Sequence, residues 1–132
     1  MDEGSVRQYL LDKPDATVGQ PFGQGVDVYK VQGKMFATLI KRAAPDGRLC
    51  WQMNLKCDPH EALILREIFS AVVPGYHMDK RHWNTIILDG SIPDGELQRF
   101  IDNSYLLVVE KLPVKVKKRI LMLLLDGQGK LE

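Results

Sequence analysis

The run RLCWQMNLK, residues Arg48–Lys56, decides the fold because apolar and polar side chains alternate along it. Successive side chains of a β-strand point to opposite faces of a sheet, so this run separates into two faces. The faces comprise Leu49, Trp51, Met53 and Leu55 on one side and Cys50, Gln52, Asn54 and Lys56 on the other. We therefore expect an antiparallel sheet with one face covered by helices and the other face open to solvent.

Two strands precede this run and form a predicted hairpin. Val26–Val31 (VDVYKV) and Lys34–Ile40 (KMFATLI) are rich in β-branched and aromatic residues and flank Gln32-Gly33. A two-residue turn with glycine is typical of a β-hairpin, because glycine readily takes the positive φ that such turns need. Together with Arg48–Lys56, these runs predict three consecutive antiparallel strands.

The N-terminal segment predicts a helix followed by a loop. Glu3–Leu11 places its apolar residues at helical spacing. Residues 12–25 (DKPDATVGQPFGQG) contain closely spaced prolines and glycines, which predict a loop without regular structure. Phe22 in this loop is expected to be buried and to pin the loop to the core, because aromatic rings bury a large apolar area.

A second helix is predicted to begin at Asp58-Pro59, where aspartate can cap the helix and proline fits its first turn. Its predicted buried stripe comprises Ala62, Leu65, Phe69 and Val72. Val73-Pro74-Gly75 is predicted to end it.

The run PGYHMDKRHWNTIILDG (74–90) follows and concentrates histidine, tryptophan and basic residues in one segment. Tyr76–Met78 and Trp83–Leu88 are predicted to be two further strands, with Asp79–His82 as their connection. Because polar, aromatic and cationic groups crowd together here, the connection is a candidate functional surface.

Two helices complete the predicted fold. An apolar stripe after Pro93 has helical spacing and predicts a long helix across the covered face of the sheet. The stripe comprises Leu97, Phe100, Ile101, Ser104, Tyr105, Val108, Val109 and Leu112. After Pro113, the run VKVKKRILMLLLDG predicts a helix that is basic at its start, apolar at its end and terminated by Gly127. The apolar end is expected either to pack on the domain or to form an interface.

The predicted order is helix, three strands, helix, two strands, helix, and a C-terminal helix. Strands and helices segregated in this way indicate an α+β fold, a two-layer sandwich with an antiparallel sheet and helices on one face. We expect a single domain over residues 1–126 and a flexible tail over 127–132, in which Leu131-Glu132 derive from a vector.

Composition and charge exclude several classes of protein. The chain of 132 residues is 45% hydrophobic and 27% charged, which is typical of a globular domain. Its net charge of +1 argues against binding to polyanions through bulk charge alone. It has neither a signal-peptide pattern nor an apolar run long enough to span a bilayer. Two cysteines without a signal pattern predict reduced thiols in the cytoplasm, and we expect a monomer.

The residues predict neither catalysis nor a metal site. Cys57 and His60 are the only closely spaced pair of soft metal ligands, and Cys50 lies an odd number of positions from Cys57, on the opposite face of a continuous strand. No nucleophile motif or phosphate-binding glycine loop is present. His77 and His82 have side chains suited to acid–base chemistry, but histidines of such connections are more often surface or structural groups. We expect a non-enzymatic protein without a cofactor or metal.

Six motifs occur along the chain in a fixed order. They are KPDA (13–16), PFG (21–23), VYKVQGKMFA (28–37), NLKCDP (54–59), PGYHMDKRHWNTIILDG (74–90) and PDGELQRFIDNSYLLVV (93–109). Together they resemble the MmcQ/YjbR family, from about residue 6 to residue 112. The chain departs from the family pattern at Asp15, where a small residue is usual, and at Gln20, where an acidic or aromatic residue is common. The resemblance implies a two-layer domain similar to frataxin-like and secretion-chaperone-like domains.

The resemblance also implies DNA binding, and the open sheet face and basic connection offer groups for it. Lysine and arginine contact phosphates, while amide and aromatic side chains contact bases. The candidate residues are Lys30, Gln52, Asn54, Lys56, His77, Lys80, Arg81, His82, Trp83, Lys115, Lys117, Lys118 and Arg119. Trp83 has a second interpretation, as a buried anchor of the strand. The alternative function is a chaperone-like adaptor that binds a protein partner through the same sheet face.

Overall fold

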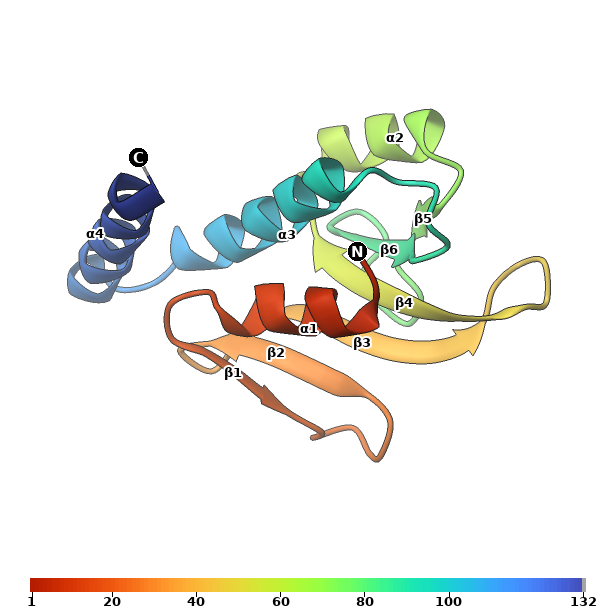
Figure 1. The fold of residues 1–132 in the computed structure, drawn as a ribbon, viewed down its shortest axis with the longest axis horizontal. Helices are drawn as coiled ribbons and strands as arrows, with labels where there is room; N and C mark the ends of the chain where they lie inside the picture. Colours follow the sequence, from red (N-terminus) through yellow and green to blue (C-terminus); the bar gives the residue numbers. More distant parts are fainter. Residues whose placement is uncertain (132) are drawn as a thin grey trace.

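The computed structural model describes residues 1–131 and the side chains of residues 1–127. Its strands form one antiparallel sheet in the order β1-β2-β3-β4-β6-β5, and helices α1, α2 and α3 lie over one face of that sheet (Figure 1). The elements are α1 (Glu3–Leu11), β1 (Ala16–Gly19), β2 (Asp27–Val31), β3 (Lys34–Ala43), β4 (Leu49–Lys56), α2 (Pro59–Ile68), β5 (Val72–Pro74), β6 (Trp83–Ile87), α3 (Asp94–Val109) and α4 (Val114–Leu131). The predicted α+β class is confirmed, with one strand more than the sequence indicated.

The face of the sheet beneath the helices is apolar. Leu39, Met53 and Ile86 stand opposite one another on β3, β4 and β6, and each is at most 1% exposed. The whole predicted stripe of α3 is buried against this face. The alternation along β4 is therefore confirmed in the core, although Leu49, at the end of the strand, is 71% exposed.

One polar residue in the buried stripe of α3 joins the helix to the sheet. Ser104 is fully buried, and its hydroxyl donates to the carbonyl oxygen of Phe36 at 2.6 Å and accepts from the amide of Lys56 at 2.8 Å. The hydroxyl thus satisfies two backbone groups that would otherwise be covered by α3 without a partner.

The predicted turn and helix cap are also confirmed. Gln32 and Gly33 have φ angles of 52° and 76°, as a type I′ hairpin turn requires. The carboxylate of Asp58 accepts from the amides of His60 and Glu61 at 3.1 and 3.2 Å and so caps α2.

The predicted end of α2 is wrong. The helix ends at Ile68, and Val72–Pro74 form the edge strand β5, which pairs with β6. The β-branched pair Val72-Val73 favours a strand, and Pro74, which cannot donate a backbone hydrogen bond, is tolerated in a strand at the edge of a sheet.

The predicted irregular loop over residues 12–25 is wrong in part. Ala16–Gly19 form β1, an edge strand that pairs with β2. Both prolines, Gly23 and Gly25 lie outside the strand, and Gly19, its last residue, pairs with Val28. Phe22, which was predicted to be buried, is 67% exposed, because the turn that carries it extends away from the core.

The C-terminal helix α4 lies beyond the end of α3, at the left of Figure 1. Ile120 is fully buried, whereas Met122 and Leu125 are each 65% exposed, so the apolar end of α4 packs on one side only. The helix extends to Leu131 instead of ending at Gly127. The division into a domain up to residue 126 and a tail stays a prediction, and Glu132 lies outside the described residues. No helix within residues 1–131 combines the length and apolar character needed to cross a bilayer.

Candidate nucleic-acid-binding face

The face of the sheet opposite the helices, called the outer face below, carries basic residues. The strand register places Lys30, Arg42 and Lys56 on this face, from β2, β3 and β4. Asp27 is the only carboxylate within the strands β1 to β6, and it points to the other face, where Arg7 of α1 donates to it. The outer face of the described strands is therefore cationic.

The predicted open character of this face is wrong near its centre, because the β5–β6 connection (75–82) folds over it. The backbone oxygen of Tyr76 accepts from the side-chain amide of Asn54 at 3.4 Å, and the amide of Tyr76 donates to the hydroxyl of Thr85 at 3.0 Å. The hydroxyl of Thr85 in turn donates to the side-chain oxygen of Asn54. This closed network fixes the connection on the sheet and leaves Thr85 only 1% exposed.

Residues 76–78, predicted to be a strand, form a turn instead. His77 has a φ of 59°, in the left-handed region that non-glycine residues rarely occupy. Just before it, the amide of Gly75 donates to the carbonyl oxygen of Trp83 at 3.0 Å. This positive φ costs free energy, and such strain is concentrated at binding and catalytic sites in proteins.

The middle of the connection is held by its own side chains. The carboxylate of Asp79 accepts from the amide of Arg81 at 3.0 Å and lies 2.7 Å from Nδ1 of His82. The hydrogen bond with His82 is the main reason why the pKa of Asp79 is lowered. Asp79 and His82 therefore shape the turn. Lys80 and Arg81 are exposed on it, and the ammonium of Lys80 also donates to the carbonyl oxygen of Gly75 at 3.3 Å.

The predicted site residues fall into separate groups. His77, Lys80 and Arg81 are exposed and His82 is half-buried on the connection, while Lys30 and Lys56 are half-buried on the outer face. The other three candidate residues of the strands are not free to contact DNA. Gln52 is 4% exposed, Trp83 is 9% exposed, and the side chain of Asn54 donates to the backbone oxygen of Tyr76. The burial of Trp83 favours its second interpretation as an anchor, and neither Trp83 nor Gln52 is accessible to a base in this conformation.

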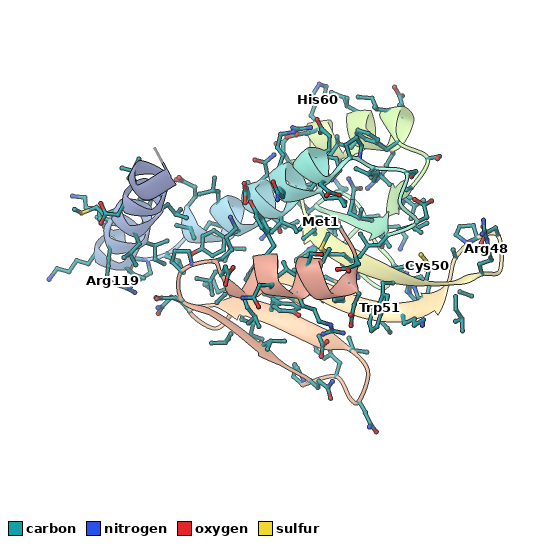
Figure 2. All side chains as sticks on the ribbon, viewed as in Figure 1. Met1, Arg48, Cys50, Trp51, His60 and Arg119 are labelled. Carbon is teal, nitrogen blue, oxygen red and sulfur yellow. The ribbon has the colours of Figure 1, made fainter. Side chains whose placement is uncertain are left out.

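The predicted basic cluster of α4 does not join this face. Lys117 pairs with Glu110 at 2.8 Å, and Arg119 pairs with Asp15 at 2.5 Å. Lys115 and Lys118 are exposed on the same helix. Figure 2 shows Arg119 at the left end of the molecule, far from β5 and β6, which lie to the right of centre in Figure 1.

Two residues of the outer face are absent from the set predicted from sequence. The Nε of Arg42 donates to the side-chain oxygen of Gln52 at 2.8 Å, and its guanidinium carbon lies 3.3 Å from the centre of the Tyr76 ring. The turn at residues 44–47 sets the hairpin register, so the position of Arg42 on the polar face could have been found from sequence. The stacking of Tyr76 on it could not, because it depends on the fold of the connection.

The two cysteines are half-buried. Burial raises the pKa of Cys57 to about 11 and also raises the pKa of Cys50, so both remain protonated near neutral pH. Within the described part of the chain, no three side chains of histidine, cysteine, aspartate or glutamate gather as metal ligands would.

Comparisons with known proteins agree with this fold. The family model YjbR matches residues 11–107. The uncharacterised protein YjbR of Escherichia coli K12 is 34% identical over 88% of this chain and 94% of its own length, and the uncharacterised protein YbdF of E. coli O157:H7 is 32% identical over 88% and 91%.

Two solved structures share the fold over most of this chain. The crystal structure of a Deinococcus radiodurans protein with the domain DUF419 has a TM-score of 0.75 and 29% identity, over 89% of this chain and 86% of that chain. A Pseudomonas syringae protein has a TM-score of 0.74 and 25% identity, over 81% and 98%. The resemblance seen in the sequence motifs is thereby confirmed, and the chain belongs to the MmcQ/YjbR family.

Proposed function

We propose that the protein is a non-catalytic module that binds duplex DNA weakly through its outer face and the β5–β6 connection. The observation that carries the proposal is the charge of this surface. Lys80 and Arg81 are exposed in the connection that leads into β6. The first residue of β6, Trp83, pairs with Lys56, and the strands carry no carboxylate on the outer face. Cationic side chains gathered on one face can neutralise phosphates even though the net charge is only +1.

The mode of binding that we propose is contact with the phosphate backbone. Gln52 and Trp83, the groups expected to read or stack on bases, are buried, which leaves mainly ammonium and guanidinium groups to meet the nucleic acid. Such contacts carry little sequence information and weaken as salt rises. We therefore expect low sequence preference and a strong dependence on ionic strength.

Binding of a protein partner remains the second candidate function. Apolar side chains are exposed on the outward side of α2, where Leu63 is 58% and Ile68 is 63% exposed. Exposed apolar groups of this size favour contact with another protein. This observation supports an adaptor, although on α2 and not on the predicted sheet face.

The remaining expectations are part of the same proposal. Helices on one face of an antiparallel sheet support a likeness to frataxin-like and secretion-chaperone-like domains. The unpaired cysteines Cys50 and Cys57 support a reducing location, which we propose to be the cytoplasm. A monomeric state stays a prediction.

A titration with a fluorescein-labelled DNA duplex, followed by fluorescence anisotropy between about 20 and 200 mM salt, tests the proposal. We expect binding at low salt that is weaker in the K80A/R81A variant, with the slope of log K against log salt shallower by about 2. The matched control is K115A/K118A, which removes two exposed lysines from α4 and is expected to bind like the wild type.

Two results would refute DNA binding at this face. The first is an absence of any anisotropy change at low salt. The second is an equal loss of affinity in K80A/R81A and in K115A/K118A, since this would show that only the overall charge matters. An absence of DNA binding by the wild type, together with binding of a folded protein through α2, would favour the adaptor.

A further inference from the structure

A groove of about 450 Å³ lies on the outer face, between the end of the β3–β4 hairpin and β5. Its walls include Arg42, Gln52, Val73, Pro74, Tyr76 and Ile87. The volume is within the range of small-molecule sites, which are mostly apolar and contain a few fixed polar groups. Except for Arg42 and the polar atoms of Gln52 and Tyr76, these side chains are apolar.

Arg42 is held rigidly in the wall of this groove. Gln52 accepts from its Nε at 2.8 Å, and the amide nitrogen of Gln52 donates to the backbone oxygens of Arg42 and Ala43 at 3.4 and 3.2 Å. The guanidinium carbon lies 3.3 Å from the centre of the Tyr76 ring. One hydrogen bond and one stacking contact therefore fix the plane of the guanidinium before any ligand arrives.

The charge of Arg42 is not balanced by the protein. Among residues 1–127, no carboxylate pairs with it and no acceptor binds its two terminal nitrogens, and no acidic residue lines the groove. Partial burial lowers the pKa of Arg42, as expected for a cation that has lost water without gaining an anion. Of the other half-buried arginines, Arg7 pairs with Asp27 and Glu3. Arg66 has no carboxylate partner among the described residues either, but its guanidinium donates to Asn84 and to the backbone oxygens of Lys80 and Trp83, so its terminal nitrogens are not left without an acceptor as those of Arg42 are.

We propose that the groove binds a small organic oxyanion, a phosphate or carboxylate attached to an apolar or aromatic body. The terminal nitrogens of Arg42 donate to the oxyanion in the bidentate manner typical of guanidinium groups. Val73, Pro74 and Ile87 contact the apolar body. The strained backbone conformation at His77 keeps the Tyr76 ring stacked on Arg42, so the strain contributes to the geometry of the site.

This proposal does not rest on DNA binding. Lys80 and Arg81, which carry the proposed phosphate contacts to DNA, do not line the groove. The two proposals can therefore fail separately, and each has its own variant.

The test is a titration of the ¹⁵N-labelled protein with phenyl phosphate, benzoate and inorganic phosphate, followed by amide chemical shifts. We expect saturable shifts at Val73, Tyr76 and Ile87 with at least one of the aromatic anions, and the stronger of the two identifies the oxyanion. Inorganic phosphate is expected to bind at least about tenfold more weakly, because it lacks the body that contacts the apolar wall.

Arg42→Gln is expected to reduce the affinity for the aromatic anion about tenfold or more, since it removes the charged donors. Lys41→Gln is the matched control, because it removes one charge from the neighbouring residue, whose side chain points to the opposite face. K80A/R81A is expected to retain anion binding. Arg42→Lys keeps the charge but not the fork of donors, and it should also bind more weakly than the wild type.

Three outcomes would overturn the proposal. They are an absence of saturable shifts with both aromatic anions, equal affinities of the wild type and R42Q, and equal losses in R42Q and K41Q. If R42Q does not fold, R42K takes its place, and wild-type affinity of R42K would refute bidentate recognition.

Discussion

Gly75, the first residue of the β5–β6 connection, packs directly against Trp83 at the start of β6. A Cβ atom built on Gly75 would lie 2.8 Å from Cβ of Trp83 and 2.9 Å from the carbonyl oxygen of Trp83. Both distances are below the normal contact distance for a methyl group. Gly75→Ala therefore inserts one methyl group where the chain leaves no room for it.

The size of the effect follows from how firmly the neighbouring atoms are held. Trp83 is 9% exposed, and its carbonyl oxygen accepts from Gly75 at 3.0 Å and from Arg66 at 3.4 Å. The methyl group therefore displaces backbone as well as a side chain, for which we expect a cost of about 1–3 kcal/mol. For 132 residues, an unfolding entropy of about 2.1 cal/mol/K per residue gives about 0.28 kcal/mol/K in total, so Tm should fall by about 4–11 °C.

Thermal unfolding followed by circular dichroism measures this change. Gly95→Ala is the control: Gly95 lies in the first turn of α3, a Cβ atom added there would have no neighbour within 4 Å, and alanine favours a helix. We expect the Tm of G95A to equal or slightly exceed that of the wild type. A Tm of G75A as high as that of G95A would refute the close approach that the structure shows.

Two further substitutions test the core and the charge pairs. Ser104→Ala leaves the carbonyl of Phe36 and the amide of Lys56 without their buried partner, so we expect the free energy of unfolding in urea to fall by about 1–3 kcal/mol, whereas the exposed Ser70→Ala should change it little. Burial alone would raise the pKa of Asp27, but hydrogen bonds from Arg7 and Gln20 outweigh it and lower the pKa. The ionised carboxylate therefore adds stability above the unfolded pKa near ~4, and this stability is lost as the pH falls through the lower folded pKa. Urea titrations across this range should show a weaker pH dependence in D27N than in the wild type, and identical dependence would contradict a stabilising role of the pair.

The parts of the fold that could be predicted from sequence are those in which periodicity reports burial directly. The period of two along Arg48–Lys56 predicted which side of β4 faces the helices, and the helical period from Leu97 to Leu112 predicted the buried stripe of α3. Each pattern is long enough to exclude the competing structure. The turn at Gln32-Gly33 could also be predicted, because few residue pairs can adopt the two positive φ angles of this turn.

The edge strands could not be predicted in the same way. Ala16–Gly19 and Val72–Pro74 are too short to show a period, and Phe69 and Val72 continue the helical spacing of α2 by coincidence. Both segments form strands because they pair with a neighbouring strand, and the local sequence does not reveal such pairing.

The candidate site, like the fold, has some features that could be predicted from sequence and others that could not. The positions of Lys56 and Asn54 on the polar face followed from alternation, but the cover over that face did not. It depends on the turn at His77, where a non-glycine residue takes a positive φ without any sequence signal. Once this turn places Tyr76 over the sheet, Arg42 becomes part of a groove, and its importance could not have been inferred from the strand pattern alone.

The edge position of β5 makes one wall of the groove less stable than the central strands of the sheet. β5 has three residues, pairs on one side only and ends in Pro74, which donates no backbone hydrogen bond. Short strands of this kind open locally at a small free-energy cost, well below that of global unfolding. Amide protons of β5 should consequently exchange with solvent faster than those of β3 and β4. A ligand bound against Val73 and Tyr76 would slow this exchange. Local opening of β5 would therefore control the rates at which a ligand binds to the groove and leaves it.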